Sequence, residues 1–196
     1  FDGTAFVSLF ARLDGGDVVI NGGPTVTTAD VEATNGIIHV VDAVINIPTV
    51  VDFATSSPGL TSLVAALTRG DLPTDFVDVL TMDGPFTVFA PTNQAFQDLL
   101  DSNPDWNELG DINAATLDAV LKYHVTDAGN VRSTGLMDDM TVNTLLENQS
   151  FTIDLADPNQ PAINDGAGNN TNITFTDIQA ANGVVHVIDA VLLPAP

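Results

Sequence analysis

Two stretches of the chain repeat one pattern of apolar and polar positions. Residues 35–44 read Asn-Gly-Ile-Ile-His-Val-Val-Asp-Ala-Val, and residues 182–191 read Asn-Gly-Val-Val-His-Val-Ile-Asp-Ala-Val. Each opens with Asn-Gly, which favours a turn, and continues with a run that is apolar at both odd and even positions. Such a run predicts a central strand that is covered on both faces. Each stretch then approaches a proline, Pro48 or Pro194, which cannot continue a strand ladder.

The distance between the two stretches indicates a duplicated domain. Subtracting 39 from 186, the positions of the two matching histidines, gives a period of about 147 residues. This period is far longer than a solenoid repeat. We therefore expect residues 48–196 to form a complete domain, and residues 1–47 to be the C-terminal part of a preceding copy.

The pattern within residues 48–196 changes from helical to extended. Apolar residues recur at helical spacing in the first part, and the candidate N-caps are Thr49, Thr92 or Asn93, and Asn113. The predicted helices lie near residues 49–55, 60–67, 74–80, 93–100 and 113–121. The predicted strands lie at residues 86–90, 141–145, 150–155, 162–163, 172–175 and 184–191. Helices followed by strands in one unit predict an α+β fold. In the first copy we expect strands at residues 5–13, 17–20 and 25–28.

The charge excludes two classes of partner. Acidic residues outnumber basic ones by 26 to 4, which gives a formal net charge of −22. Such a surface repels phosphates, so we expect neither nucleic acid nor an anionic membrane to bind. The same charge predicts that the stability of the fold rises with ionic strength. The chain contains no cysteine, so it forms no disulfide.

The titratable residues do not form a catalytic pattern. His39 and His186 fall at matching points of the two predicted central strands, where we expect buried histidines with satisfied hydrogen bonds. His124 ends a predicted helix beside Tyr123, and a structural role is favoured there as well. The chain has no Gly-x-Ser-x-Gly motif, and acidic neighbours such as Asp138-Asp139 are ordinary in so acidic a chain. We therefore predict no enzyme activity and no cofactor.

The loops at residues 154–159 and 164–172 are rich in Asp, Asn and Gly, which are residues that can supply oxygen ligands to hard cations. Neither loop has the Asp-x-Asp-x-Asp-Gly spacing with a distal Glu, and Asx-rich turns are common for backbone reasons alone. We predict no specific metal site, although divalent cations could bridge acidic surfaces loosely.

Three segments together resemble the fasciclin (FAS1) domain family. Residues 84–96, Gly-Pro-Phe-Thr-Val-Phe-Ala-Pro-Thr-Asn-Gln-Ala-Phe, resemble its first signature box. Residues 122–125, Lys-Tyr-His-Val, resemble its central Tyr-His motif, and residues 182–194 resemble its second box. The three segments stand in family order. The residues that carry the two boxes are Thr87, Phe89, Pro91, Thr92, Asn93, Phe96, Asn182, Gly183, His186 and Asp189.

The resemblance implies a wedge-shaped β-sandwich of about seven strands, with several helices packed on it. It also implies a non-catalytic adhesion module that is secreted or displayed on a cell surface, with a protein or a glycan as its partner. In animal members, adhesion motifs fall at positions that match Tyr123-His124 and Asp177-Ile178, with Asp30-Val31 as the weaker equivalent in the first copy. The alternative is a structural spacer or polysaccharide-binding domain in a tandem array.

Two further expectations concern the source and the first copy. The acidic, lysine-poor composition departs from that of the animal members and resembles that of a marine or salt-adapted microbe. The apolar strand that ends the first copy cannot be buried by residues 1–47 alone. This segment could pack on the complete domain, pair with another chain, or exchange with residues 150–194. Direct connectivity favours the second copy in its own domain, so we expect the first copy to pack on a neighbouring surface or to drive self-association.

Overall fold

The computed structural model of the chain describes residues 6–157 and 160–196. Within residues 48–196, for which the name complete unit is kept below, the helices are α1 (Val50–Ser56), α2 (Thr61–Leu67), α3 (Phe76–Leu80), α4 (Asn93–Asp101) and α5 (Ala114–Tyr123). Its strands are β5 (Phe86–Pro91), β6 (Val125–Thr126), β7 (Thr141–Asn143), β8 (Ser150–Asp154), β9 (Ala162–Asn164), β10 (Asn170–Ala180) and β11 (Gly183–Ile188). Short 3-10 turns lie at Pro58–Leu60, Leu109–Asp111 and Ser133–Gly135.

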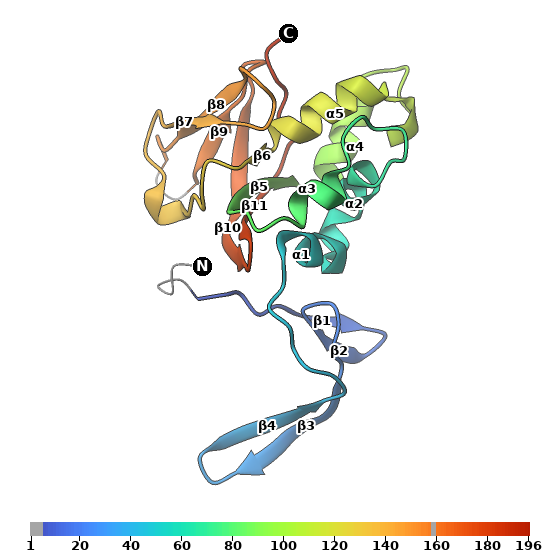
Figure 1. Cartoon of the computed structure of the whole chain (residues 1–196), viewed down its shortest axis with the longest axis vertical. Coiled ribbons are helices and arrows are strands. Elements are labelled where there is room, and N and C mark those ends of the chain that lie inside the picture. The colour runs from blue at the N-terminus through green and yellow to red at the C-terminus, as the bar shows by residue number, and fades with distance from the viewer. Residues whose placement is uncertain (1–5, 158–159) are drawn as a thin grey trace.

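The strands of the complete unit form one mixed sheet in the order β6-β5-β11-β10-β9-β8-β7 within the described residues. Strand β11 is central: it pairs antiparallel with β10 and parallel with β5. Five of its six residues are buried, as the apolar pattern predicts. The helices gather on the β5 side of the sheet, and strands β7–β9 lie on the opposite side (Figure 1). The expected α+β class with about seven strands is confirmed.

Side-chain caps set where most of the helices begin. Thr49 accepts a hydrogen bond from the Asp52 amide, and the Asp52 carboxylate accepts one from the Thr49 amide in return, which makes a capping box. The side chains of Asp75, Thr92 and Asn113 cap α3, α4 and α5 by accepting from backbone amides in the first turn, without the reciprocal bond.

Among the described residues, no single helix is long and apolar enough to cross a membrane. Helix α1 and residues 58–67 pass that test only together, as a pair bent by 96°.

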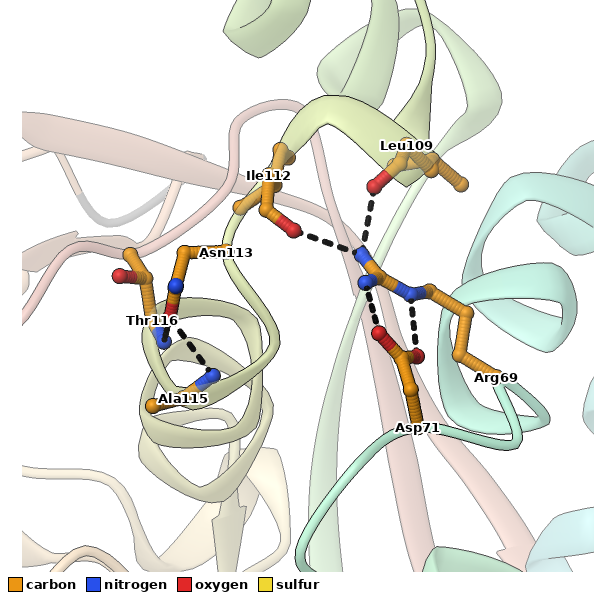
Figure 2. Close-up of polar contacts among 7 residues, drawn as sticks. All are labelled: Arg69, Asp71, Leu109, Ile112, Asn113, Ala115 and Thr116. Carbon is orange, nitrogen blue, oxygen red and sulfur yellow. Dashed lines mark hydrogen bonds and ion pairs between the residues drawn. The ribbon is translucent and has the colours of Figure 1, made fainter.

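Arg69 joins the end of α2 to the loop before α5. Its guanidinium donates to the carbonyl oxygens of Leu109 and Ile112 at 2.6 and 2.9 Å, and it forms a two-point pair with the Asp71 carboxylate at 3.0 and 2.7 Å. Figure 2 shows this fork of contacts beside the Asn113 cap of α5. One of the four basic residues of the chain therefore stabilises the contact between α2 and the loop before α5.

Residues 6–47, for which the name first copy is kept below, contain the strands β1 (Ala11–Asp14), β2 (Asp17–Ile20), β3 (Val26–Ala33) and β4 (Gly36–Val41). The pairing register of the β3–β4 hairpin matches that of β10–β11. The five paired positions of β3–β4 match those of β10–β11 after a shift of 147, and both hairpins have irregularities at the same two places. Asp30 and Asp177 both adopt left-handed backbone, with φ of 58° and 61°.

The hydrogen bonds around the hairpins are duplicated as well. The Asp30 amide donates to His39 Nδ1 at 3.3 Å, and the Asp177 amide donates to His186 Nδ1 at 3.4 Å. An isolated bridge links Val19 of β2 to Thr25, the residue before β3, at the place where β9 pairs with β10 in the complete unit. Strands β1 to β4 thus follow the order of β8 to β11.

The environments of the two hairpins differ, and several expectations are wrong for that reason. β4 is exposed at five of its six positions, so it is not the doubly covered central strand that its pattern predicts. His39 is exposed, whereas His186 is fully buried. Within the described residues, β4 has no neighbour comparable to β5 and no helices above it. In Figure 1 the hairpin extends away from the rest of the chain.

Several strand boundaries also differ from those expected. The strand expected at residues 5–13 starts only at Ala11, and residue 5 lies outside the described residues. Residues 8–10 instead contact the complete unit: the Ser8 amide donates to the Gln179 carbonyl at 2.8 Å, and Phe10 packs edge-on against Phe53. The strand expected at 172–175 spans 170–180, the one expected at 141–145 ends at Asn143, and β6 was not expected.

Candidate functional site

Tyr123 and His124 lie in the interior, at the end of α5. The Tyr123 side chain is fully buried; its hydroxyl donates to the Ser150 carbonyl and accepts from the Gly166 amide, both at 2.8 Å. His124 is 2% exposed. Its Nδ1 donates to the Val120 carbonyl at 2.7 Å, and its Nε2 accepts from the Leu192 amide at 2.9 Å. Tyr123 therefore attaches the end of α5 to Ser150 and Gly166, and His124 attaches it to the C-terminal segment at Leu192.

This hydrogen-bond pattern requires a neutral imidazole with its proton on Nδ1, since Nε2 must present a lone pair to Leu192. Burial lowers the pKa of His124 to about 4, because the charged ring would lose its hydration there. Burial lowers the pKa of His186 as well. Neither ring is presented to a substrate, so the arrangement supports structural roles for both.

Asp177 and Ile178 lie at the irregular point of β10. The Asp177 carboxylate is half-buried: one oxygen accepts from the Ser133 amide at 2.7 Å, and the other accepts from the Ser133 hydroxyl. Ile178 is 8% exposed and belongs to the core between the sheet and the helices. The carboxylate therefore holds the 131–133 loop, and the isoleucine holds the core. In the first copy, Asp30 and Val31 are exposed.

The two predicted pairs are connected through the interior by Phe89. Its ring contacts Phe151 edge-on at 5.0 Å and stacks on His186 at 5.4 Å, measured between ring centroids. Phe151 in turn contacts Tyr123, and His186 accepts from the Asp177 amide. The Tyr-His and Asp-Ile positions are thus parts of one packed framework, and they do not form a shared exposed surface.

The other signature residues also join separate segments. Thr87 is fully buried; its hydroxyl donates to the Gly129 carbonyl and accepts from the Val131 amide. Asn93 bridges to residues 58–62, and Asn182 accepts from the Val50 amide while it donates to the carbonyls of Leu80 and Met82. Asp189 binds Asn172 through the backbone amide and the side chain.

The remaining signature positions act through packing and backbone approach. Phe96 is 1% exposed in the core, Thr92 caps α4, and Pro91 ends the pairing of β5 with β11. At Gly183 any side chain would lie 2.2 Å from the Phe86 carbonyl oxygen, so only glycine lets the two strands meet.

An exposed apolar groove lies where the first copy meets β10. It has a volume of about 490 Å³ and is lined by Leu9, Phe10, Phe53, Phe175, Ile178 and Val187, with Asp177 at its edge. Phe175 is 63% exposed and Leu9 is 61% exposed. The sequence reasoning missed this groove, because the alternation of β10 changes at its irregularities and turns Phe175 outward.

In the loop at residues 164–172, the Asp165 carboxylate accepts hydrogen bonds from backbone amides. Asp165 is 7% exposed, and its two oxygens accept from the amides of Ala167, Asn169 and Leu193 at 3.1, 2.7 and 2.9 Å. Residues 158 and 159 of the other loop lie outside the described residues. Across the described ranges, no three His, Asp or Glu side chains gather in a way that could hold a metal ion.

Comparison with known proteins decides the family. The Fasciclin domain matches residues 3–48 and 58–194. The chain belongs to the fasciclin (FAS1) family. It is 33% identical to Protein sll1483 of Synechocystis sp., over 88% of this chain and 89% of that protein. It is also 33% identical to human Periostin, over 83% of this chain but only 18% of that protein.

Two other FAS1 comparisons extend the range of relatives. Immunogenic protein MPB70 of Mycobacterium bovis is 34% identical over 72% of this chain and 66% of that protein. The solved structure of a FAS1 domain pair from the insect cell adhesion molecule Fasciclin I matches with a TM-score of 0.66 at 23% identity, over 94% of this chain and 66% of that one. This likeness shows the FAS1 fold.

FAS1 domains are non-catalytic adhesion modules, so the chain is not an enzyme. Members of the family bind extracellular proteins in general, and the homologues are mostly secreted or found at the cell surface.

Proposed function

We propose that this protein is an extracellular adhesion module that contacts a protein or glycan on another surface through the apolar groove beside Asp177. The observation that carries this proposal is the exposure of Phe175 and Leu9 in a groove whose lining is apolar except for Ser8 and Asp177. An exposed aromatic ring beside a carboxylate suits an apolar side chain or the face of a sugar. Tyr123 and His124 would support binding indirectly, through the segments that they hold.

The proposed source is a marine or salt-adapted microbe, and the proposed location is the exported or surface-bound fraction of its proteins. The support is the net charge of −22, which keeps the surface soluble and favours conditions in which salt screens self-repulsion. Neither nucleic acid nor anionic membrane suits such a surface.

We infer that residues 1–47 are the last four strands of a preceding FAS1 unit. The support is the matching register of β3–β4 and β10–β11, the family match to residues 3–48, and a likeness to a domain pair that extends over 94% of the chain. The second candidate function is a spacer in a tandem array. It is supported by the contact of residues 8–10 with the complete unit, which would hold consecutive units together.

The adhesion proposal is tested by immobilising the chain and measuring its binding to matrix proteins, glycans and whole cells. We expect Phe175→Ser to reduce binding at least tenfold, because it removes the exposed ring from the groove. Met137→Ser is the matched control, since Met137 is 65% exposed and does not line the groove. Equal binding by both folded variants would contradict the groove, and no binding by the unaltered chain would favour the spacer function.

A further inference from the structure

A small apolar cavity lies among the helices of the complete unit. Helices α1, α2 and α3 gather near β5 and β11 (Figure 1), and between these elements lies a cavity of about 50 Å³, measured as the space open to the centre of a water molecule. One water needs about 10–15 Å³ of such space, so about four groups of methylene size would fit. Protein interiors hold few voids larger than one water, because an empty space loses packing contacts and lowers stability.

The walls of this cavity are apolar because of the residues that the surrounding elements place there. Ala54 of α1 and Ala90 of β5 are small and leave the space open, and the buried side chains of Leu63, Phe76 and Val88 line its inner part. Apart from two threonines, every residue that lines the cavity is apolar. Such a space stays dry and accepts apolar molecules, since water would lose hydrogen bonds there.

The mouth of the cavity lies where Thr55, Thr68 and Val77 line it, because these three residues are exposed. The Thr55 hydroxyl donates to the Val51 carbonyl of its own helix at 2.9 Å. The Thr68 hydroxyl likewise donates to the Val64 carbonyl at 2.8 Å. Each hydroxyl proton is thus used within the protein, and the oxygen lone pairs remain for a ligand. The mouth therefore accepts hydrogen bonds from a ligand and does not donate them.

A wider polar hollow adjoins this mouth. It has a volume of about 370 Å³ and shares Leu67, Thr68 and Val77 with the cavity. Its other lining residues include Asp75 and Asp78, which are both exposed. The cavity and the hollow together offer an apolar space that opens into a polar one. That arrangement suits a molecule with an apolar tail and a polar head group.

The charges of the hollow determine which head group suits it. Arg69 lines the hollow, but its guanidinium is held by the Asp71 carboxylate and by two carbonyl oxygens of the loop before α5. The Asp78 carboxylate accepts no hydrogen bond from the other described residues. An anionic head group would meet this carboxylate and the net charge of −22, whereas a hydrogen-bond donor would find acceptors.

We propose that α1, α2 and α3 form a binding site for an amphiphile. About four carbons of its alkyl chain occupy the cavity, and its head group lies in the hollow beside Asp78. The head group donates hydrogen bonds and carries no negative charge, a chemistry that hydroxyl-bearing and ammonium-bearing head groups share. The site has no lining residue in common with the groove beside Asp177, so it is separate from the proposed adhesion surface.

The test titrates the full chain with hexyl glucoside, hexylammonium and hexanoate, which share one alkyl chain and differ in head group. Binding is followed through the NMR signals of the methyl groups of Leu63 and Val88, which lie inside the cavity. We expect saturable shifts with the first two probes and an affinity at least tenfold lower for hexanoate. Xenon should shift the same signals, because it requires only an apolar space. Methylammonium, which has the charge without the chain, should not.

Two substitutions test the cavity. Ala54→Leu should weaken the binding of hexyl glucoside and hexylammonium at least tenfold, because the larger side chain fills the space that the alkyl chain needs. Ala65→Leu is the matched control: Ala65 is an exposed residue of α2 that does not line the cavity, so affinity should be unchanged. Ala90→Val fills the space from β5, and it replaces Ala54→Leu if that variant does not fold.

A further pair of variants tests the hollow. Asp78→Asn should weaken the binding of hexylammonium at least threefold and leave the effect of xenon as it is. Asp105→Asn removes an equally exposed charge that does not line the hollow, so it should change neither.

Saturable shifts that persist at full affinity in the filled variants would overturn the proposal. So would hexanoate that binds as tightly as the other two probes, or the absence of saturable shifts with all three. None of these readouts involves the groove beside Asp177, so the outcome of the Phe175 experiment does not affect them.

Discussion

His124 is a buried histidine whose two ring nitrogens are both committed. Nδ1 donates to Val120 and Nε2 accepts from Leu192, so an added proton on Nε2 would replace an attraction with a repulsion. The bond from the Leu192 amide to this imidazole attaches the C-terminal segment to the end of α5. It makes this attachment sensitive to acid.

We predict that acidification weakens the fold through this residue. The unfolded chain binds a proton at His124 near pH 6.5, but the folded chain binds it only at a pKa of about 4. Protonation therefore favours the unfolded chain, and the free energy of unfolding falls by about 3 kcal/mol as the pH drops from 6.5 to 4. Denaturant melts at several pH values measure this slope.

The matched comparison uses His124→Asn and His39→Asn. The first variant should be less stable at pH 7 and should lose less stability on acidification than the unaltered chain. The second changes His39 of β4, which is exposed to water, and should leave the slope as it is. An unchanged slope in His124→Asn would show that other groups carry the acid sensitivity.

At the residue scale, the sequence identifies the important positions better than it identifies their roles. Asn182 and Thr87 stand out through the family motifs, but the segments that they join lie far away along the chain. His39 and His186 have the same local sequence, yet one is exposed and the other buried. The difference in burial comes from the segments that pack around each histidine, and these segments cannot be identified from the local sequence.

At the scale of elements, short helices are held by their ends as much as by their faces. α1 has seven residues and α3 has five, which is too short for a helix to be stable alone. Caps at Thr49 and Asp75 and packing on the sheet stabilise them. The two hydrogen bonds from Arg69 likewise stabilise the loop that leads into α5.

We predict that Arg69→Lys destabilises the chain by about 1–3 kcal/mol. Lysine can neither reproduce the planar fork nor reach both carbonyl groups of Leu109 and Ile112, so a buried acceptor is left without a partner. The free energy of unfolding in urea measures the loss. Asp71→Asn is the control: Asp71 is exposed, so a smaller effect is expected. A loss in Asp71→Asn equal to that in Arg69→Lys would assign the role to the ion pair.

Elements with a strong local signal are predictable here, and those set by pairing are not. The starts of α1, α4 and α5 follow from Thr49, Thr92 and Asn113, because the caps act within one turn. Strand β6 has only two residues, and β10 continues through two irregularities. Both are defined by their partner strands, so no alternation along the sequence marks them.

At the scale of the whole molecule, charge opposes compaction. Three of the four basic residues, Arg12, Arg69 and Lys122, are paired with nearby acids. Most of the 26 acidic residues therefore have no cation to offset them. Their mutual repulsion is long-ranged at low salt, where the screening length exceeds the spacing between surface groups.

We predict that the melting temperature rises by several degrees between about 0.01 and 1 M NaCl, as the screening length shortens from roughly 30 to 3 Å. Thermal melts at a series of salt concentrations measure the effect. A parallel series in sucrose controls for general exclusion of solutes from the protein surface. A melting temperature that does not respond to NaCl would contradict the prediction.

The repeat is the feature of the whole molecule that the sequence makes most accessible, since a period of about 147 residues is visible without a structure. The sequence does not reveal that the two parts of the first copy have different surroundings. Residues 8–10 pack on the complete unit, while the β3–β4 hairpin is exposed to water. This difference depends on which surfaces are free, and that is decided by the assembled molecule.

The position of β11 affects how the fold would resist a pulling force. The chain enters the complete unit beside the start of β11, where the Ala181 amide donates to the Pro48 carbonyl at 2.8 Å, and it leaves beyond the end of β11. A pull applied through both ends therefore runs along this strand. The hydrogen bonds to β5 and β10 lie across the pull, so they are loaded in shear and must yield together. A tether that holds two surfaces together would be drawn along its most resistant direction.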